Sequence, residues 1–397
     1  MSKIMAVNAG SSSLKFQLFN MPEETVITSG VVERIGFEDA IFTIKVNGEK
    51  VKTVTSIPDH TVAVDMLLKA LVDHKIVASY DEIDACGHRV VQGGPYFDDS
   101  CIVTAESEAK VEELIELAPL HNHANLVGCR AFREALPHAK HVFVFDTAFH
   151  QTMDEERYLY CLPYEYYTKY QVRRYGAHGT SHKYVSARAI DMLGNPEHSK
   201  VIVCHLGNGA SLSAVKDGVC VDTSMGFTPL AGVMMGTRSG DIDPSIIPYV
   251  MRKENLDINQ MLDVLNKKSG MLGVSGISSD SRDIEDAYKE GNEAAIRTSR
   301  LYARIVSKFI GSYFVELGGV DAIAFTAGLG ENAAYLRSLI IEDIKEALGA
   351  EIDESLNEKR SGDDRVISTE DSKVKIMVIP TNEEVMIARD TVRLLNL

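Results

Sequence analysis

The sequence predicts an α/β fold built from two similar halves. Along its 397 residues, short apolar, β-branched runs alternate with longer segments whose apolar residues recur at helical spacing. Residues 5–18 and 201–215 share one pattern, in which an apolar strand, a tight turn of Gly, Ser and Asn, and a second alternating strand follow one another. Successive backbone N–H groups in such turns bind anions. The two copies predict two halves that each present a phosphate-binding hairpin to a shared cleft.

The first half is expected to consist mainly of strands, followed by helices and a short last strand. A helix at 61–74 is predicted because its apolar residues fall on one face. The helix at 125–135 is expected to end before Pro137. The expected strands are 3–7, 14–19, 25–32, 41–46, 51–57, 83–91 and 141–145, and the expected helices are 61–74, 106–117 and 125–135.

The second half repeats this plan after a Tyr-rich stretch at 152–175, which is either a boundary region or a packed interface. Its expected strands are 201–206, 211–216, 218–223, 321–326 and 374–379. Its expected helices are 244–253, 258–267, 293–317, 333–348 and 383–395, and the Gly-rich segment before 333 is expected to be a turn.

Composition excludes several classes of function. The net charge is −16 and no run of Lys and Arg exceeds two residues, which argues against a nucleic-acid partner. The six cysteines form no C-x-x-C pair, so neither a zinc site nor a redox pair is indicated. No apolar run reaches membrane length and no signal-peptide layout begins the chain, so a cytoplasmic protein without a membrane partner is expected.

The first hairpin carries a polar edge formed by Asn8, Ser11, Ser13 and Lys15. Ser13 and Lys15 share one face of the second strand, and a lysine beside hydroxyl groups suits a phosphate oxygen. An ordinary solvated hairpin is the alternative.

Arg89 lies inside an apolar strand that runs into a Gly-Gly turn. A buried guanidinium needs an anionic partner, which is either a structural carboxylate or a ligand, and the adjacent glycines favour a ligand. Asp146 ends the apolar run 142–145. A carboxylate at the C-terminal end of a strand is a frequent catalytic or metal-binding position, with a turn or N-cap aspartate as the alternative.

Other polar groups stand beside glycines in the second half. His178 follows Gly176 and precedes Gly179, which favours contact with an oxyanion or phosphate, and Arg238 lies in a long Gly-punctuated loop of the kind that is usually functional. Residues 278–283 have strong helix-capping chemistry or contact a nucleotide. Residues 328–333 fit the pattern G-x-G-x-x-A; an adenosine-binding turn is favoured over a dinucleotide fingerprint, with a plain turn as the alternative. The Walker phosphate loop is absent.

Together these segments resemble the acetate kinase (acetokinase) family. The resemblance follows the whole chain in order, at 7–15, 87–91, 174–182, 205–209, 222–229, 234–244, 327–332 and 381–384. It implies duplicated actin-like ATPase (ribonuclease H-like) domains flanking a nucleotide cleft. The implied boundaries are an N-terminal domain at 1–149, a C-terminal domain at 150–383 that makes most nucleotide contacts, and a helix at 384–397 that returns to the N-terminal domain.

The resemblance also implies a reaction and a set of roles. The reaction is reversible phosphoryl transfer from ATP to acetate, giving acetyl phosphate and ADP, by a homodimer that uses Mg²⁺ or Mn²⁺. Asn8 and Glu383 would hold the metal, Arg89 would bind the acetate carboxylate, Asp146 would be the active-site carboxylate, and His178 and Arg238 would stabilise the transition state. Lys15, Ser11, Ser13, His205, Leu206, Gly207, Asn208, Gly209, Asp280, Ser281, Arg282, Gly328, Leu329, Gly330, Glu331 and Asn332 would contact ATP. Val91, Leu120 and Pro229 are expected around the substrate methyl group.

Two positions depart from the family pattern, which usually has an aromatic residue at Ala177 and a histidine at Gln92. Ala177 enlarges or loosens the acyl pocket in this reading, so a propionate or butyrate kinase stays an alternative. An actin-like ATPase switch is an alternative of another class. Arg89 and Arg238 argue against it, because a nucleotide switch does not need two arginines for a second anion.

Overall fold

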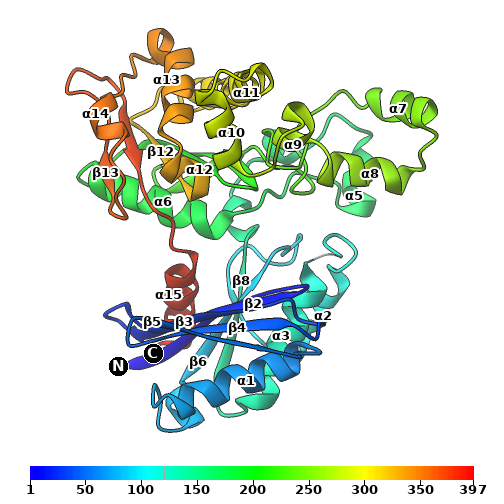
Figure 1. Ribbon diagram of the computed structural model, residues 1–397, viewed down its shortest axis with the longest axis vertical. Helices are drawn as coiled ribbons and strands as arrows, with labels where there is room; N and C mark the ends of the chain where they lie inside the picture. Colours follow the sequence, from blue (N-terminus) through cyan, green and yellow to red (C-terminus); the bar gives the residue numbers. More distant parts are fainter. Residues whose placement is uncertain (120) are drawn as a thin grey trace. The chain divides into compact units, whose positions relative to one another are not determined.

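The computed structural model describes residues 1–119 and 121–397 and divides into two compact units, each of which is described by itself. Unit 1 comprises Met1–Phe149 and Asn382–Leu397, and unit 2 comprises His150–Thr381. Asn382 and Glu383, which the sequence-based boundary at 383 assigned to the second domain, lie in unit 1. The chain thus leaves unit 1 once and returns to it for its last helix (Figure 1).

Unit 1 is built on one mixed sheet with the strand order β5-β4-β3-β2-β1-β6-β8-β7. The hairpin β1–β2 is antiparallel, with Asn8 opposite Lys15, whereas β1, β6 and β8 run parallel. The strands are β1 (Ser2–Gly10), β2 (Ser13–Met21), β3 (Thr25–Glu33), β4 (Ala40–Val46), β5 (Glu49–Thr55), β6 (Ala85–Val90), β7 (Cys101–Ile102) and β8 (Lys140–Phe145).

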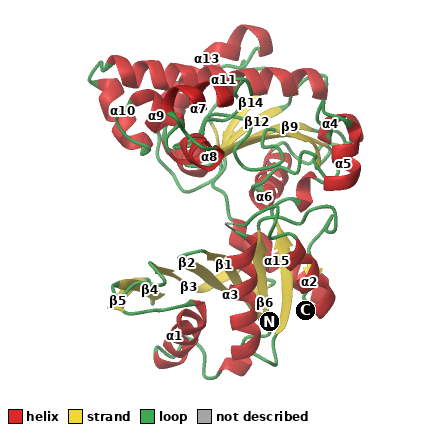
Figure 2. Ribbon diagram, turned by 90° about the vertical axis from the view of Figure 1, so that its right-hand side faces the viewer, coloured by secondary structure: helices red, strands yellow, loops and turns green. Residues whose placement is uncertain are grey.

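Helices cover both faces of this sheet (Figure 2). They are α1 (His60–Asp73), α2 (Ala105–Glu113), α3 (Asn122–Ala135) and α15 (Glu383–Leu395), with short 3₁₀ turns at Tyr80–Glu82 and Ala148–His150. On β6, Cys86 packs with Phe132 of α3, while a Cβ on the next residue, Gly87, would lie 2.4 Å from Ile387 of α15. Because adjacent strand residues face opposite sides, α3 and α15 lie on opposite faces of the sheet.

Unit 2 repeats the central part of this topology. Its sheet has the order β11-β10-β9-β12-β14-β13, in which β9–β10 is an antiparallel hairpin and β9, β12 and β14 run parallel. The strands are β9 (Lys200–Leu206), β10 (Ala210–Lys216), β11 (Val219–Thr223), β12 (Ala322–Thr326), β13 (Arg365–Val366) and β14 (Lys375–Val378). The order β3-β2-β1-β6-β8 in unit 1 and β11-β10-β9-β12-β14 in unit 2 is the same, so the predicted duplicated α/β fold is confirmed.

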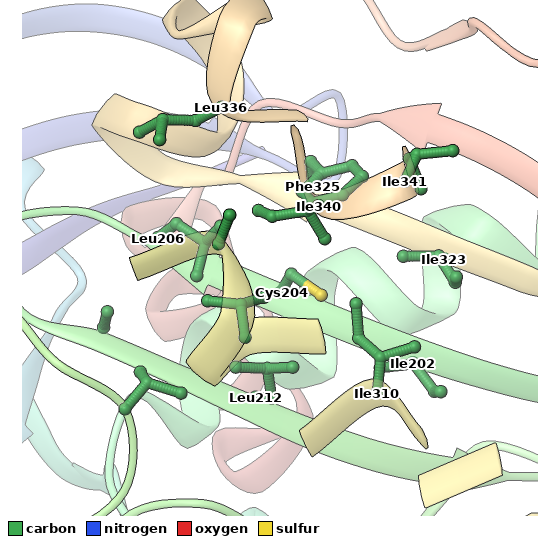
Figure 3. Close-up of a cluster of buried hydrophobic side chains, with 14 of the residues drawn as sticks. Ile202, Cys204, Leu206, Leu212, Ile310, Ile323, Phe325, Leu336, Ile340 and Ile341 are labelled. Carbon is green, nitrogen blue, oxygen red and sulfur yellow. The ribbon is translucent and has the colours of Figure 1, made fainter. Parts of the chain in front are cut away.

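The core of unit 2 lies between its sheet and the helices α11 and α13. Side chains of β9, β10 and β12 meet Ile310 of α11 and Leu336, Ile340 and Ile341 of α13 (Figure 3). The helices are α4 (Glu155–Tyr158), α5 (Tyr164–Tyr170), α6 (Gly179–Met192), α7 (Ile246–Glu254), α8 (Ile258–Lys267), α9 (Gly270–Ser275), α10 (Ser281–Lys289), α11 (Glu293–Leu317), α12 (Ala327–Asn332), α13 (Ala334–Leu348) and α14 (Glu354–Asn357). Within residues 1–119 and 121–397, no helix has the length and apolarity to span a membrane.

Two segments differ from the expected local structure. The Tyr-rich stretch forms α4 and α5 and packs inside unit 2, where the Arg173 guanidinium lies 3.7 Å from the centre of the Tyr158 ring and the Tyr160 hydroxyl accepts a hydrogen bond of 2.8 Å from the Phe227 N–H. Residues 327–332 form the short helix α12 rather than a turn. Ala327 reaches it with a φ of +65°, a left-handed conformation that the sequence does not reveal for alanine.

Candidate functional site

Unit 1 gathers its polar side chains where β1, β6 and β8 end. Asn8 lies near the end of β1, Arg89 is the residue before the last of β6, and Asp146 follows β8 directly. Strand alternation places all three on the face covered by α15, because Gly87, two residues before Arg89, contacts that helix. Glu383 is the first residue of α15. The Asn382 side chain caps this helix by accepting a hydrogen bond from the Val385 N–H.

The guanidinium of Arg89 is hydrogen-bonded to the carboxylate of Asp146 and to the side-chain amide of Asn8. Its Nε donates a 3.0 Å hydrogen bond to Asp146 Oδ1, its Nη2 donates to Asp146 Oδ2, and its Nη1 donates a 3.2 Å bond to Asn8 Oδ1. The structural carboxylate that the sequence left open as a partner of Arg89 is therefore Asp146. The Asp146 N–H in turn donates to the Val90 carbonyl at 2.9 Å, which fixes the carboxylate beside β6.

Acidic groups crowd this end of unit 1. Burial raises the pKa of Glu383 to about 7; Arg89 and Lys15 oppose that shift, and Asp146 and Glu384 add to it. Arg89 has its own pKa raised by Asp146, Glu383 and Glu384, although burial lowers it. The cluster favours binding of a cation, because one more positive charge would stabilise the carboxylates in their ionised form.

Two asparagines of α3, which sequence reasoning missed, hold the loop after β6. Asn125 accepts from the Val91 N–H at 3.1 Å and donates to the Ala9 carbonyl at 2.7 Å. Asn122 accepts from the Gln92 N–H at 3.0 Å and donates to the Gln92 carbonyl at 2.8 Å. Their signal in the sequence is the i, i+3 spacing of two amides at the start of an amphipathic helix.

The other residues expected in unit 1 are placed as follows. Ser11 is exposed in the turn of the first hairpin, Ser13 pairs with Gly10, and Lys15 is exposed. Val91 is buried, and Leu120 lies outside the described residues. Gln92, one of the two departures from the family pattern, is buried and accepts from the Gly94 N–H at 2.8 Å. It therefore stabilises the turn after β6.

In unit 2, the turn of the second hairpin brings His178 and Arg238 together. The turn closes with a 3.0 Å hydrogen bond from the Gly207 N–H to the Gly209 carbonyl. A Cβ on Gly209 would lie 3.3 Å from His178 Nε2 and 3.9 Å from Arg238 Nη1. Because Gly209 has no side chain, the side chains of His178 and Arg238 can both approach the backbone of the turn.

His178 is held in a strained conformation at the start of α6. It is the N-cap residue, with a φ of +61° that is uncommon for any residue with a side chain. Its ring stacks on His205 with the ring centres 4.2 Å apart, and its Nδ1 lies 2.9 Å from the Ser211 hydroxyl. Ala177, the other departure from the family pattern, is buried, and its carbonyl lies 3.1 Å from His150 Nε2. Local strain that the surrounding contacts maintain is frequent at functional positions.

Arg238 is a half-buried guanidinium bonded to neutral acceptors. Its Nη1 donates to the Pro229 carbonyl at 3.2 Å and contacts Met235 Sδ at 3.8 Å. Burial lowers its pKa from the usual value. A desolvated guanidinium without a carboxylate among its hydrogen-bond partners in the described chain is suited to binding an anion.

A pocket in unit 2 collects part of the predicted nucleotide site. Its volume is about 640 Å³, within the range of about 300–1,000 Å³ typical of sites for small ligands. Of the predicted residues, Asn208, Asp280, Ser281, Arg282, Gly328, Leu329 and Asn332 line it. Ser279 and Ala333, which belong to the predicted segments 278–283 and 328–333, also line it. Glu285 and Arg360 line it as well and were not predicted. Arg360 lies in the polar segment between α14 and β13, which has no motif, so the sequence carried no signal for it.

The remaining predicted nucleotide residues do not line this pocket. Gly330 gives its carbonyl to the buried Arg337, whose Nη1 donates at 2.8 Å, and Glu331 Oε1 accepts from the Ala327 N–H at 2.9 Å. His205 binds the Ser181 hydroxyl through Nδ1 at 2.8 Å, and Leu206 is buried in the core. These residues therefore stabilise α12 and the second hairpin through internal contacts and do not face the pocket. Asp280 accepts from the Arg282 N–H and side chain, so its capping role and its place in the pocket coexist.

Cys86, His88 and His141 form a buried cluster outside these sites, with their donor atoms within 4.8 Å of one another. The imidazoles are nearly coplanar at 16°, and their centres are 5.2 Å apart, so His88 Nε2 and His141 Nδ1 meet head on at 2.9 Å. Two nitrogens bound to one zinc ion would be about 3.3–3.4 Å apart, since zinc–nitrogen bonds of about 2.0–2.1 Å meet at a tetrahedral angle. The cluster is therefore a hydrogen-bonded pair inside the core.

Comparison with known proteins covers the whole chain. The family model described as the acetokinase family matches residues 3–389. A protein of Geobacillus sp. (strain WCH70) named acetate kinase is 60% identical over 398 residues, covering 100% of both chains. The crystal structure of Porphyromonas gingivalis acetate kinase matches with a TM-score of 0.95 and 47% identity over 100% of both chains. That of a propionate kinase from Francisella tularensis matches with a TM-score of 0.93 and 41% identity, covering 99% of this chain and 100% of the other.

Proposed function

The chain belongs to the acetokinase family, and from this premise we propose that it transfers the γ-phosphoryl group of ATP to acetate, giving acetyl phosphate and ADP, reversibly. The relatives named acetate kinase share 60% and 47% identity with it, and the propionate kinase shares 41%, which favours acetate over propionate. The observation that carries the proposal is the bonding of Arg89.

Arg89 is prepared to bind a second carboxylate. A guanidinium has two edges that fit a carboxylate, one formed by Nε and Nη2 and one formed by Nη1 and Nη2. Asp146 occupies the first edge. Nη1 gives one of its two protons to Asn8 Oδ1, so Nη1 and Nη2 each keep one further proton for a ligand. The Arg89 side chain is 19% exposed whereas that of Asp146 is 1% exposed, so a ligand reaches the arginine and not its partner.

This arrangement suits a nucleophile that needs no base. A carboxylic acid with a pKa of about 4 is ionised at neutral pH, so the obstacle is the approach of one anion to another. Asp146 is engaged on both oxygens by Arg89, which supports a role in orienting Arg89 rather than in accepting a proton. Arg89 would neutralise and align the acetate carboxylate.

The oxygen atoms of Asn8 and Glu383 would hold a divalent metal ion, and Mg²⁺ or Mn²⁺ fits them best. Carboxylate and amide oxygens are the ligands these ions prefer. The raised pKa of Glu383 beside Asp146 and Glu384 supports the fit, because the nearby cationic side chains do not fully stabilise the ionised form of this carboxylate and a bound metal ion would. When bound, the metal ion would neutralise charge on the phosphate oxygens. Lys15 would contact the phosphates beside Asn8, its partner across the hairpin, with Ser11 and Ser13 nearby.

Unit 2 would supply the nucleotide site and further positive charge. The pocket lined by Asn208, Asp280 and Gly328 would take the nucleotide, and the Gly207–Gly209 turn would contact its phosphates. His178 and Arg238, next to that turn, would stabilise the charge on the transferring phosphoryl group. Each well-placed donor of this kind is typically worth about 3 kcal/mol in a transition state.

One assay tests the proposal. The purified protein is given MgATP with acetate, propionate, butyrate or no acid, and acyl phosphate is trapped with hydroxylamine while ADP is measured. Acetate should give the highest kcat/KM, with ADP and trapped product in equal amounts. Higher kcat/KM with propionate or butyrate would reassign the acid. ADP formation that is independent of acid would favour the ATPase switch. A homodimer and a cytoplasmic location remain predictions for this chain.

A further inference from the structure

One buried hydroxyl group lies between two imidazole rings in unit 2. The Ser211 Oγ is 2.9 Å from His178 Nδ1 and 2.7 Å from His182 Nε2. Ser211 lies on β10, and both Ser211 and His182 are 0% exposed, so water cannot replace either contact. His182 is one helical turn after His178 on α6, which explains why both rings reach the same strand residue.

The number of protons limits how these three side chains can be bonded. A serine hydroxyl has one proton to donate, and a neutral imidazole has one protonated nitrogen. Burial, with His150 and His205 nearby, lowers the pKa of His182 well below its usual value, so His182 is neutral. Both imidazoles could also donate to Ser211 Oγ, but the buried hydroxyl proton would then have no acceptor, because Ser211 Oγ has no other hydrogen-bond partner among the described residues. Two arrangements therefore remain. Either His182 donates to Ser211 and Ser211 donates to His178 Nδ1, or both bonds run in the opposite direction.

The second nitrogen of His182 selects between them. Its Nδ1 is buried and has no hydrogen-bond partner among the described residues. If Ser211 donated to His182, the proton of His182 would sit on Nδ1 as an unpaired buried N–H group. If His182 donates to Ser211, Nδ1 is an unpaired acceptor instead. Unpaired buried N–H groups are the rarer of the two in native proteins, so the first arrangement is favoured.

Resting on the proposed role of His178, we propose that Ser211 and His182 are positioning residues that keep the proton of neutral His178 on Nε2. Nε2 is the nitrogen that faces the Gly207–Gly209 turn, at 3.3 Å from the position of a Cβ on Gly209. A phosphoryl oxygen offers only lone pairs, so a protonated Nε2 attracts it and an unprotonated Nε2 repels it. Other polar groups near the ring include His205, which stacks on it, and Arg238, across Gly209. His150 packs edge-on against His182 and contacts Cys220.

Nitrogen NMR of protein labelled with ¹⁵N in histidine tests the proposal without using activity. The spectrum is recorded above the ordinary imidazole pKa of about 6.5, and a His178→Asn sample identifies the His178 signals among the 12 histidines. We expect a protonated Nε2 and an unprotonated, hydrogen-bonded Nδ1. A proton on Nδ1, or on both nitrogens across the neutral pH range, would overturn the proposal. His178→Gln supplies the same assignment if His178→Asn fails to fold.

Substitutions then separate positioning from packing. In Ser211→Ala, the Nδ1 signal should lose its hydrogen-bond shift and kcat should fall about tenfold, with both KM values changed less than about twofold. Ser213→Ala is the matched control, because Ser213 is equally buried on the same strand but bonds Thr223. His182→Gln keeps an N–H donor near the Nε2 position and should retain the Nδ1 shift. An unchanged Nδ1 signal in Ser211→Ala would contradict the proposal. A normal kcat in His178→Asn would instead contradict the proposed role of His178 and leave the proton position as measured.

Discussion

Asp146 accepts two hydrogen bonds from Arg89, and only the arginine of this pair is open to solvent, at 19% against 1% exposure of the side chain. The carboxylate is the inner member and the guanidinium the outer one. An anion that approaches from solvent therefore meets the cation first. The pairing also spans two parallel strands, β6 and β8, so the position of Arg89 is fixed by the sheet and not by a loop.

Asp146→Asn is expected to lower kcat about 100-fold and to raise the KM for acetate. The amide cannot engage both Nε and Nη2 as an acceptor, so Arg89 loses its orientation and its counter-charge. Because Asp146 is not a proton acceptor in this proposal, the pH profile of the residual activity should keep the wild-type shape. A profile that loses its acid limb, where the rate rises as a base becomes ionised, would assign Asp146 the role of a general base. Thermal unfolding of the variant controls for the loss of a buried ion pair, which costs about 3–5 kcal/mol in other proteins.

Arg238→Ala is expected to reduce kcat by about 100- to 1,000-fold with no loss of thermal stability. Arg238 donates to a carbonyl and contacts a thioether, and burial lowers its pKa, so its charge is not needed to hold the fold. Its removal should leave the melting temperature unchanged or higher. Arg252→Ala, on the exposed side of α7, is the matched control. Near-normal turnover of Arg238→Ala would remove its assigned role.

The ion pair between Glu24 and Arg389 should make stability depend on pH in the acidic range. Arg389 of α15 donates to both oxygens of Glu24, at 2.5 and 2.8 Å, and it lowers the pKa of Glu24 from the ordinary value of 4.5. In the unfolded chain Glu24 takes up its proton first, so the contribution is complete above about pH 4.5 and is lost as the pH falls through the lower folded pKa. Both side chains are about a third exposed, which limits the effect to about 1 kcal/mol or less.

The measurement is the difference in melting temperature between wild type and Glu24→Gln as a function of pH. The difference should be largest near neutral pH and should vanish at strongly acid pH. Glu23→Gln, its exposed neighbour, serves as the control. A difference that grows as the pH falls would contradict the assignment.

Gly87→Ala is expected to destabilise unit 1 by about 1–3 kcal/mol. A Cβ at this position would lie 2.4 Å from Ile387 Cγ2 and 2.4 Å from Thr391 Oγ1, so α15 must move away from β6. Glu383 moves with its helix, and binding of Mg²⁺ should weaken in the same variant. Gly311→Ala is the contrasting substitution, because nothing lies within 4 Å of its Cβ position in the middle of α11. That variant should be stabilised by about 0.5–1 kcal/mol. Equal unfolding temperatures for the two variants would refute the argument from close packing.

Local signals explain which elements the sequence predicts accurately. The bounds of α8, α11 and α15 coincide with those expected, since Asp257, Asn292 and Asn382 cap their first turns and Gly318 ends α11 in the left-handed conformation. The short strands β7 and β13 have two residues each and no pattern of their own, and they form only because β8 and β14 offer an edge. Helix α12 begins at Ala327, whose positive φ has no signal in the sequence.

The site residues also divide into those with a local signal in the sequence and those that depend on long-range contacts. Charged residues inside apolar strands or beside glycines pointed to Arg89, Asp146, His178 and Arg238. The pairing of Arg89 with Asp146 stayed open because strand order sets it, and strand order is a long-range property. Asn122, Asn125 and Ser211 resemble ordinary residues of a helix or strand until the neighbouring backbone and rings are in place.

The return of the chain to unit 1 has a consequence for biosynthesis. Helix α15 packs on β1, β6 and β8 and carries Glu383, yet a ribosome makes it only after the whole of unit 2. At about 5–20 residues per second, roughly 10 to 50 s separate the end of β8 from the emergence of this helix. During that interval the nascent chain exposes the apolar face of the first sheet and lacks Glu383. A chain released early would therefore present an aggregation-prone surface instead of a partly active enzyme.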